Sequence, residues 1–208
     1  MNVLEFYFDI SSPWTYLAFH NVQPIARELG VKIQWKPILV GGIFNTVNPS
    51  VYEFRKSGSR GKHQYLVKDL GDWARHAGLD IRFPPSIFPI NSVKAMRACI
   101  VLLEDAGDDD APMTRFARAA FEAYWARDED ISTDSVLVAI CRQAGVDPDR
   151  VMAGINTQAV KDRLRHHTDE LIARGGFGSP TMFVGGIDMY FGNDRLQFVR
   201  EALIKAKQ

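Results

Sequence analysis

Strand and helix patterns alternate over the first forty residues of the chain. Residues 3–8 form an apolar run with strand character, and residues 31–37 alternate between apolar and polar side chains. Residues 13–29 between them have a helical pattern that ends at Gly30, and glycine suits the left-handed position at a helix end. A crossover of this length implies parallel strands, so this region predicts a β–α–β unit.

Strand character returns only at the other end. Residues 181–184 and 187–191 are separated by Gly185-Gly186, which predicts a hairpin, and residues 194–205 predict a closing amphipathic helix. The middle is dominated by helical spacing, with a Gly/Asn/Pro-bearing loop at 41–48 and a Pro-rich loop at 83–89. The predicted helices there cover residues 51–77, 91–103, 112–126, 133–144, 148–154 and 157–174.

Two β-containing ends therefore flank a helical middle. We interpret the chain as an α/β protein in which residues 1–44 and 173–208 form one discontinuous domain. Residues 45–172 would then be an all-helical insertion domain.

Composition narrows the classes of function. Lys+Arg and Asp+Glu both number 25 in the 208 residues, so no overall charge favours nucleic acid or a membrane surface. No leader peptide or long apolar span is visible, and Cys99 and Cys141 lie in apolar helical contexts that predict buried free thiols. We expect a cytoplasmic protein that acts on a small molecule, without nucleic acid, membrane or metal.

The first candidate for chemistry is the strand-to-helix turn Ser12-Pro13-Trp14-Thr15. A thioredoxin-like redox site has this layout with Cys-x-x-Cys, but here both cysteine positions carry hydroxyls, Ser12 and Thr15. A helix N-terminus favours an anion, and a serine without a base is a poor nucleophile. Ser12 is thus either a hydrogen-bond donor to a ligand anion or an ordinary helix cap.

A second motif, Gly178-Ser179-Pro180-Thr181, stands directly before the late strand. In the thioredoxin architecture a cis-proline lies there and faces the redox turn, and the residue before it exposes backbone groups to an extended ligand. Ser179-Pro180 could also be a plain turn. The order of the two motifs along the chain favours the thioredoxin-like interpretation.

Two further polar groups have both a structural and a functional interpretation. Asn193-Asp194 precedes the last helix and could cap it while binding a ligand amine. A basic cluster is either a solvated helix face or a clamp for a carboxylate; it contains Arg55, Lys56, Arg60 and Lys62.

Three segments of the chain, residues 8–18, 177–184 and 191–196, resemble the 2-hydroxychromene-2-carboxylate isomerase family. That family is related to kappa-class glutathione transferases within the DsbA-like branch of the thioredoxin superfamily. The resemblance covers essentially the whole chain. It implies a thioredoxin-like domain with a helical insertion, glutathione as cofactor, and a homodimer.

The resemblance also implies roles for individual residues. Ser12 would stabilise the thiolate of bound glutathione, which would add to a conjugated carbon of an aromatic substrate, allow bond rotation, and leave again. The implied glutathione-binding residues are Asn48, Lys62, Ser179, Pro180, Asn193 and Asp194. Candidate contacts for an aromatic carboxylate substrate are Trp14, Lys36, Phe44, Asn48, Phe88 and Asn91.

Three functions remain open from the sequence. The first is an isomerase that interconverts 2-hydroxychromene-2-carboxylate and trans-o-hydroxybenzylidenepyruvate, or a related aromatic catabolite. The second is a kappa-class-type transferase that consumes glutathione. The third is a non-catalytic DsbA-like binding module, which would have no affinity for glutathione.

Overall fold

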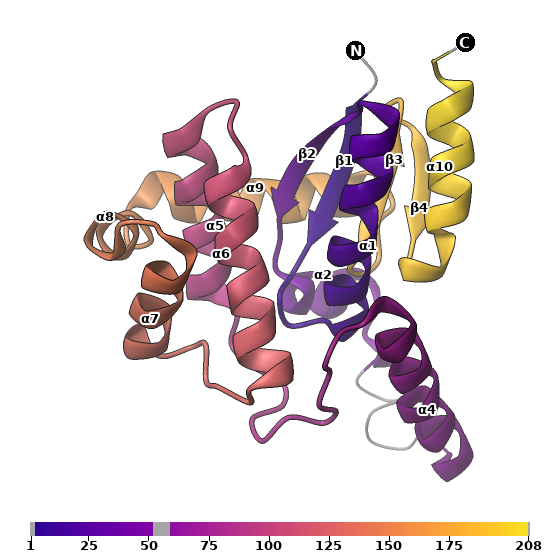
Figure 1. The fold of residues 1–208 in the computed structure, drawn as a ribbon, viewed down its shortest axis with the longest axis horizontal. Helices are drawn as coiled ribbons and strands as arrows, with labels where there is room; N and C mark the ends of the chain where they lie inside the picture. The colour runs from indigo at the N-terminus through magenta and orange to yellow at the C-terminus, as the bar shows by residue number, and fades with distance from the viewer. Residues whose placement is uncertain (1–2, 52–58, 208) are drawn as a thin grey trace.

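The computed structural model describes residues 3–51 and 59–207 (Figure 1). The strands are β1 (Val3–Phe8), β2 (Lys32–Pro37), β3 (Thr181–Val184) and β4 (Asp188–Phe191). The helices are α1 (Pro13–Leu29), α2 (Val40–Val47), α4 (Arg60–Ala77), α5 (Val93–Ala106), α6 (Ala111–Phe121), α7 (Asp134–Ala144), α8 (Pro148–Gly154), α9 (Gln158–Ala173) and α10 (Leu196–Lys205). A π-helical turn (Glu122–Ala126) extends α6, and a 3₁₀ turn (Asn193–Arg195) precedes α10.

The strands form one mixed sheet in the order β2-β1-β3-β4. β1 pairs with β2 in parallel, with Val3 opposite Lys32, which confirms the predicted β–α–β unit. β3 is antiparallel to β1, with Leu4 opposite Val184, and β3 and β4 form the predicted hairpin. The two ends of the chain therefore meet in the middle of the sheet, where β1 lies beside β3.

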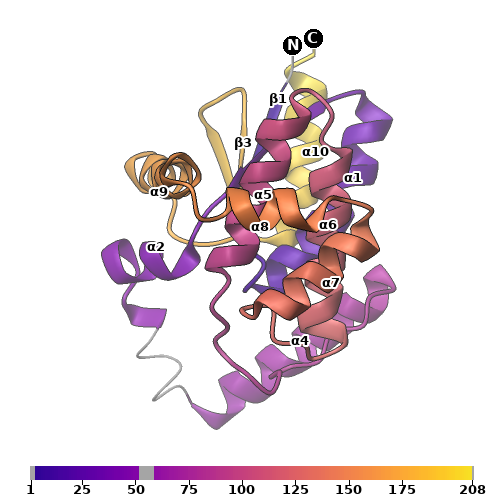
Figure 2. The same ribbon diagram turned by 90° about the vertical axis from the view of Figure 1, so that its left-hand side faces the viewer.

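Helices cover both faces of this sheet. α1 and α10 lie on one side of the strands and α9 lies on the other (Figure 2). Alternate side chains of β1 point to the two faces of the sheet, because successive side chains of a strand point to opposite sides. Phe6 and Phe8 join the large core that includes residues of α1, α5 and α6, whereas Tyr7 packs in a smaller cluster with Ile43 and Leu171.

The segment around residues 41–48 is the clearest error of the sequence-based prediction. It was expected to be a loop, but residues 40–47 form α2, which packs against α9. Ile43 on this helix is fully buried. A Cβ at Gly42 would lie 3.4 Å from the Thr168 methyl group, so this glycine lies in the contact between α2 and α9 and does not mark a turn.

The predicted helices of the middle are found with small shifts at their ends. Within the predicted helix 51–77, α4 covers Arg60–Ala77, and residues 52–58 lie outside the described part of the chain. α5–α8 gather on one side of the sheet in Figure 1, and α9 packs directly on β2 and α5. The division between residues 44 and 45 and between 172 and 173 stays a prediction.

Cys99 on α5 and Cys141 on α7 are both free and buried, as expected. Burial raises the pKa of both thiols, to about 11 for Cys141, so neither is poised as a thiolate at neutral pH. Across the described residues, no helix combines the length and the apolar character needed to cross a membrane.

His167, on the face of α9 that meets β2, gives a pH-dependent prediction. Its Nδ1 lies 3.1 Å from the Pro37 carbonyl oxygen, and burial, with help from the Lys36 charge, lowers its pKa from 6.5 to about 4. Between these values the unfolded chain binds more protons than the folded one. The free energy of unfolding should therefore fall by about 3 kcal/mol as the pH drops from 6.5 to 4.

The slope of the free energy of unfolding against pH is measured by chemical denaturation at a series of pH values. His167→Gln should remove most of it, and His76→Gln, at an exposed position of α4, should leave it unchanged. Equal slopes in the wild type and His167→Gln would show that His167 is not held neutral by the fold.

Candidate active site

Ser12 caps the N-terminus of α1 and faces the loop that precedes β3. Its extended backbone (φ −109°, ψ 123°) lets the side chain turn back, so that Oγ accepts a hydrogen bond from the Thr15 N–H at 3.3 Å. The same hydroxyl donates to the Ser179 carbonyl oxygen at 3.2 Å. The sequence motifs from the two ends of the chain are thus in direct contact.

Ser179 closes this contact from the other side. Its peptide bond to Pro180 is cis, as predicted, and its buried hydroxyl accepts the Asp9 N–H at 3.0 Å. The Ser179 and Thr15 hydroxyls are hydrogen-bonded at 2.8 Å. Because the Ser179 side chain is turned into the protein, its main chain lies toward Ser12.

The backbone N–H of Ser179 has no hydrogen-bond partner in the described part of the chain. Its carbonyl oxygen receives only the Ser12 hydroxyl there. A free N–H beside a carbonyl at a strand end can pair with the main chain of an extended peptide. The loop therefore offers a peptide-binding edge next to the Ser12 hydroxyl.

Asp9 lies directly behind the turn and is 1% exposed. Its carboxylate accepts the Ser11 N–H at 2.9 Å and the Val40 N–H at 2.8 Å. Burial raises the pKa of this carboxyl, and the hydrogen bonds oppose that rise.

Other predicted residues are brought to the same loop. Asn48 follows α2 and donates from Nδ2 to the Phe177 carbonyl oxygen at 3.2 Å. Gly192 N–H donates to the Pro180 carbonyl oxygen at 3.2 Å, and Asn193 and Asp194 directly follow Gly192.

Asn193 is 4% exposed, and within the described residues its side chain makes one hydrogen bond. Its Oδ1 accepts from Asn21 of α1 at 3.0 Å, while its buried Nδ2 has no partner in the described part of the chain. Asp194 is half exposed and pairs with Arg195. A buried amide without a partner is costly, so Nδ2 is a natural donor to a ligand.

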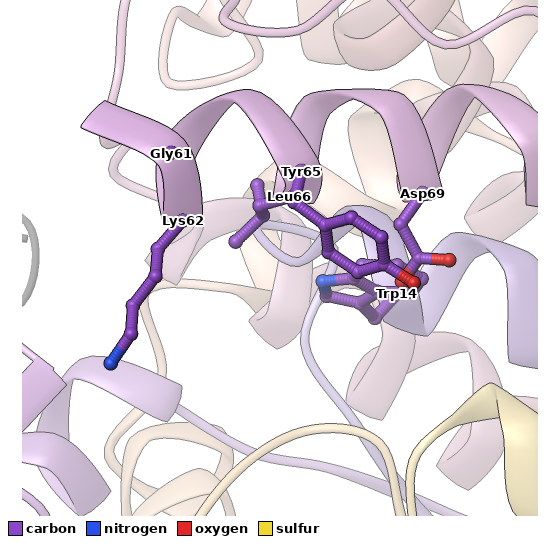
Figure 3. A pocket seen from close by; sticks show the side chains of 6 residues that line it. All are labelled: Trp14, Gly61, Lys62, Tyr65, Leu66 and Asp69. Carbon is purple, nitrogen blue, oxygen red and sulfur yellow. The ribbon is translucent and has the colours of Figure 1, made fainter. Parts of the chain in front are cut away.

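Trp14 and Lys62 line one pocket between the start of α1 and α4, with a volume of about 410 Å³ (Figure 3). Lys62 and Asp69 lie toward opposite ends of the lining row on α4, with Tyr65 and Leu66 between them. The predicted basic cluster is only partly visible, because Arg55 and Lys56 lie outside the described residues.

The remaining predicted substrate contacts lie on β2, on α2 and in the segment before α5. Lys36 pairs with Glu170 of α9 at 3.2 Å, on the face of the sheet opposite to the one that packs on α1. Asn91 accepts the Val93 N–H at the start of α5, and Phe88 stacks edge-on against Phe83. Phe44 lies partly buried on α2, the helix that was expected to be a loop.

Two side chains of the site, Asp9 and Thr15, had no assigned role in the sequence analysis. Thr15 occupies the second cysteine position of the turn, and this was the available signal for a residue facing the proline loop. Asp9 follows a strand immediately, as many site residues do, but nothing in its spacing shows that it contacts Val40 and Ser92.

The arrangement is suited to stabilising a ligand anion. A hydroxyl and the first turn of α1 meet beside a peptide-binding edge, and an N-terminal helix turn attracts negative charge. Among the described residues, no group of three or more His, Cys, Asp and Glu side chains is placed to hold a metal.

Comparisons with known proteins agree with this architecture. The DSBA-like thioredoxin domain family matches residues 3–204. A 2-hydroxychromene-2-carboxylate isomerase from Pseudomonas putida is 28% identical over 204 residues, covering 97% of this chain and 94% of the relative. Glutathione S-transferase kappa 2 from Caenorhabditis elegans is also 28% identical, covering 97% of this chain and 91% of the relative.

A solved structure of 2-hydroxychromene-2-carboxylate isomerase superposes with a TM-score of 0.81 at 26% identity, covering 98% of this chain and 95% of that one. The chain belongs to the DSBA-like thioredoxin domain family. The predicted thioredoxin-like fold of the DsbA type and the resemblance to these isomerases are confirmed.

Ser179→Ala tests the contact between the two halves of the site. It leaves the buried Asp9 N–H without an acceptor and the Thr15 hydroxyl without its partner, so we expect a loss of about 1–3 kcal/mol in the free energy of unfolding. Denaturant titration measures it. Ser135→Ala, at an exposed position of α7, should cost less than about 0.5 kcal/mol. Equal stability of the two variants would contradict the prediction.

Proposed function

We propose that this protein is a glutathione-dependent isomerase that interconverts 2-hydroxychromene-2-carboxylate and trans-o-hydroxybenzylidenepyruvate, or a related aromatic catabolite. The observation that carries the proposal is the Ser12 hydroxyl, placed at the N-terminus of α1 and hydrogen-bonded to the residue before the cis-proline. Similarity to isomerases of this kind over nearly the whole chain supports it. In this proposal the enzyme is a cytoplasmic homodimer.

Several polar groups of the chain fit glutathione. The buried Asn193 Nδ2 needs an acceptor, which a γ-glutamyl carboxylate would supply. The free Ser179 N–H and its carbonyl would pair with the cysteinyl main chain beside Pro180. Asp194 would receive the γ-glutamyl ammonium, Lys62 the glycyl carboxylate, and Asn48 a main-chain group.

Bound glutathione supplies a thiolate whose reversible addition to a conjugated double bond permits rotation about that bond. The protein's part is to favour the anion over the thiol. Ser12 would turn its O–H from the Ser179 carbonyl toward the sulfur, and the N-terminal dipole of α1 would add to this stabilisation. Trp14, at the second position of α1, would form part of an aromatic wall for the substrate.

Kappa-class-type transfer is the second candidate, favoured by relatives of that name that match over nearly the whole chain. It would use the same thiolate site. The two reactions differ in the fate of glutathione, because an isomerase returns it unchanged and a transferase leaves it in a stable adduct. Measuring free thiol before and after turnover separates them.

The Ser12 role is tested by titrating glutathione at a series of pH values while the ultraviolet absorbance of the thiolate is followed. Ser12→Ala removes a hydrogen bond to a charged group worth about 1.5–3 kcal/mol, so the pKa of the bound thiol should rise by about 1–2 pH units. Thr157→Ala, which removes the cap of α9, should leave the thiol pKa unchanged.

Failure of the wild type to bind glutathione would rule out both glutathione-dependent functions. A bound thiol whose pKa is the same in Ser12→Ala and the wild type would remove Ser12 from the mechanism.

A further inference from the structure

The carboxylate of Asp9 is buried behind the Ser12 turn without a cation. It is 1% exposed, and in the described part of the chain it forms no ion pair with Lys, Arg or His. Burying a carboxylate in this way costs free energy that hydrogen bonds must offset. No part of the isomerase mechanism proposed above uses it.

All the hydrogen bonds to this carboxylate come from segments that surround the site. Oδ1 accepts from the Ser11 N–H of the turn at 2.9 Å, and Oδ2 accepts from the Val40 N–H at the start of α2 at 2.8 Å. The side chains of Ser11 and of Ser92, which precedes α5, also favour the ionised carboxylate. One side chain thereby joins the turn to the beginning of α2.

The main chain of Asp9 makes two more contacts of the same kind. Its N–H donates to the Ser179 hydroxyl at 3.0 Å, and its carbonyl oxygen accepts the Ser12 N–H at 3.2 Å. The main chain of Asp9 is therefore hydrogen-bonded to Ser12, which caps α1, and to Ser179, which precedes the cis-proline. In the proposed site, Ser12 faces the ligand sulfur and Ser179 pairs with the cysteinyl main chain.

Two backbone N–H groups reach the two carboxylate oxygens from different sides. Only a group with acceptors at both positions satisfies them, and an ionised carboxylate is such a group. An asparagine of the same shape offers one oxygen and one NH₂, so either Ser11 or Val40 would face a donor. The geometry thus requires the acid and not merely its volume.

We propose that Asp9 is a positioning residue that holds the Ser12 turn, through Ser11 and Val40, in the geometry that stabilises a thiolate. This inference rests on the proposed glutathione site. It makes a prediction opposite in sign to that of a simple nearby charge. A negative charge disfavours a second anion. If Asp9 acted only through its charge, removing that charge would lower the pKa of a bound thiol.

The test is Asp9→Asn, with glutathione titrated at a series of pH values and the thiolate absorbance followed. We expect the pKa of the bound thiol to rise by about 1 pH unit, which is about a tenfold loss of thiolate at a pH below both values. Asp147→Asn is the matched control, because Asp147 also accepts two backbone N–H groups, at the start of the distant α8. It should leave the thiol pKa unchanged.

Two results would overturn the proposal. A lowered thiol pKa in Asp9→Asn would show that Asp9 acts through its charge. An unchanged thiol pKa with reduced thermal stability would show that its role is only structural.

A second measurement does not depend on glutathione. Amide hydrogen exchange of the ligand-free protein should be faster at Ser11 or Val40 in Asp9→Asn, with protection in α6 and α7 retained. Unchanged exchange at both amides, or a uniform increase across the molecule, would overturn the positioning role. If the wild type failed to bind glutathione while this local effect was present, the proposed function alone would fall.

Discussion

The site depends on one contact between the two ends of the chain, the hydrogen bonds that join the β1–α1 turn to the loop before β3. The Ser179 hydroxyl accepts from the Asp9 N–H and bonds to the Thr15 hydroxyl, while the Ser12 hydroxyl reaches the Ser179 carbonyl. The sheet makes this contact possible, because β1 and β3 are direct neighbours although about 175 residues separate them. A change in the β1–β3 register would separate the two motifs.

Hydroxyls at both cysteine positions of a redox turn change its chemistry but leave the helix N-terminus in place. The helix N-terminus still attracts an anion, but Ser12 and Thr15 cannot form a disulfide with each other or with a substrate. The described cysteines do not compensate, since Cys99 and Cys141 are buried and their thiols have raised pKa values. In the proposed function the anion comes from the ligand, a thiol-bearing peptide that pairs with the peptide-binding edge at Ser179.

The sequence was most informative where local pattern and three-dimensional structure agree. The strands, α1 with its Gly30 end, the hairpin and the cis bond before Pro180 follow from periodicity, turn residues and motif order. α2 was missed because Gly41 and Gly42 suggested a loop, whereas Gly42 lies in the contact of α2 with Thr168 of α9. Because α9 lies more than a hundred residues away along the chain, this contact leaves no signal in the local sequence.

The same limit applies within the site. Ser12, Ser179 and Pro180 were predicted because each belongs to a recognisable turn, and the structure brings them together. Lys36 was a candidate by residue type alone, and in the structure it pairs with Glu170. Asp9 and Thr15 were left without a role, since what distinguishes them is the set of partners that the fold brings to them.

The most direct measurement for this account is a crystal structure of the protein with glutathione bound. We expect the sulfur within hydrogen-bond distance of Ser12 Oγ, the cysteinyl main chain paired with Ser179, and Asn193 Nδ2 donating to the γ-glutamyl carboxylate. A complex in which the sulfur lies away from Ser12, with the hydrogen bond from Ser12 to the Ser179 carbonyl still intact, would contradict it.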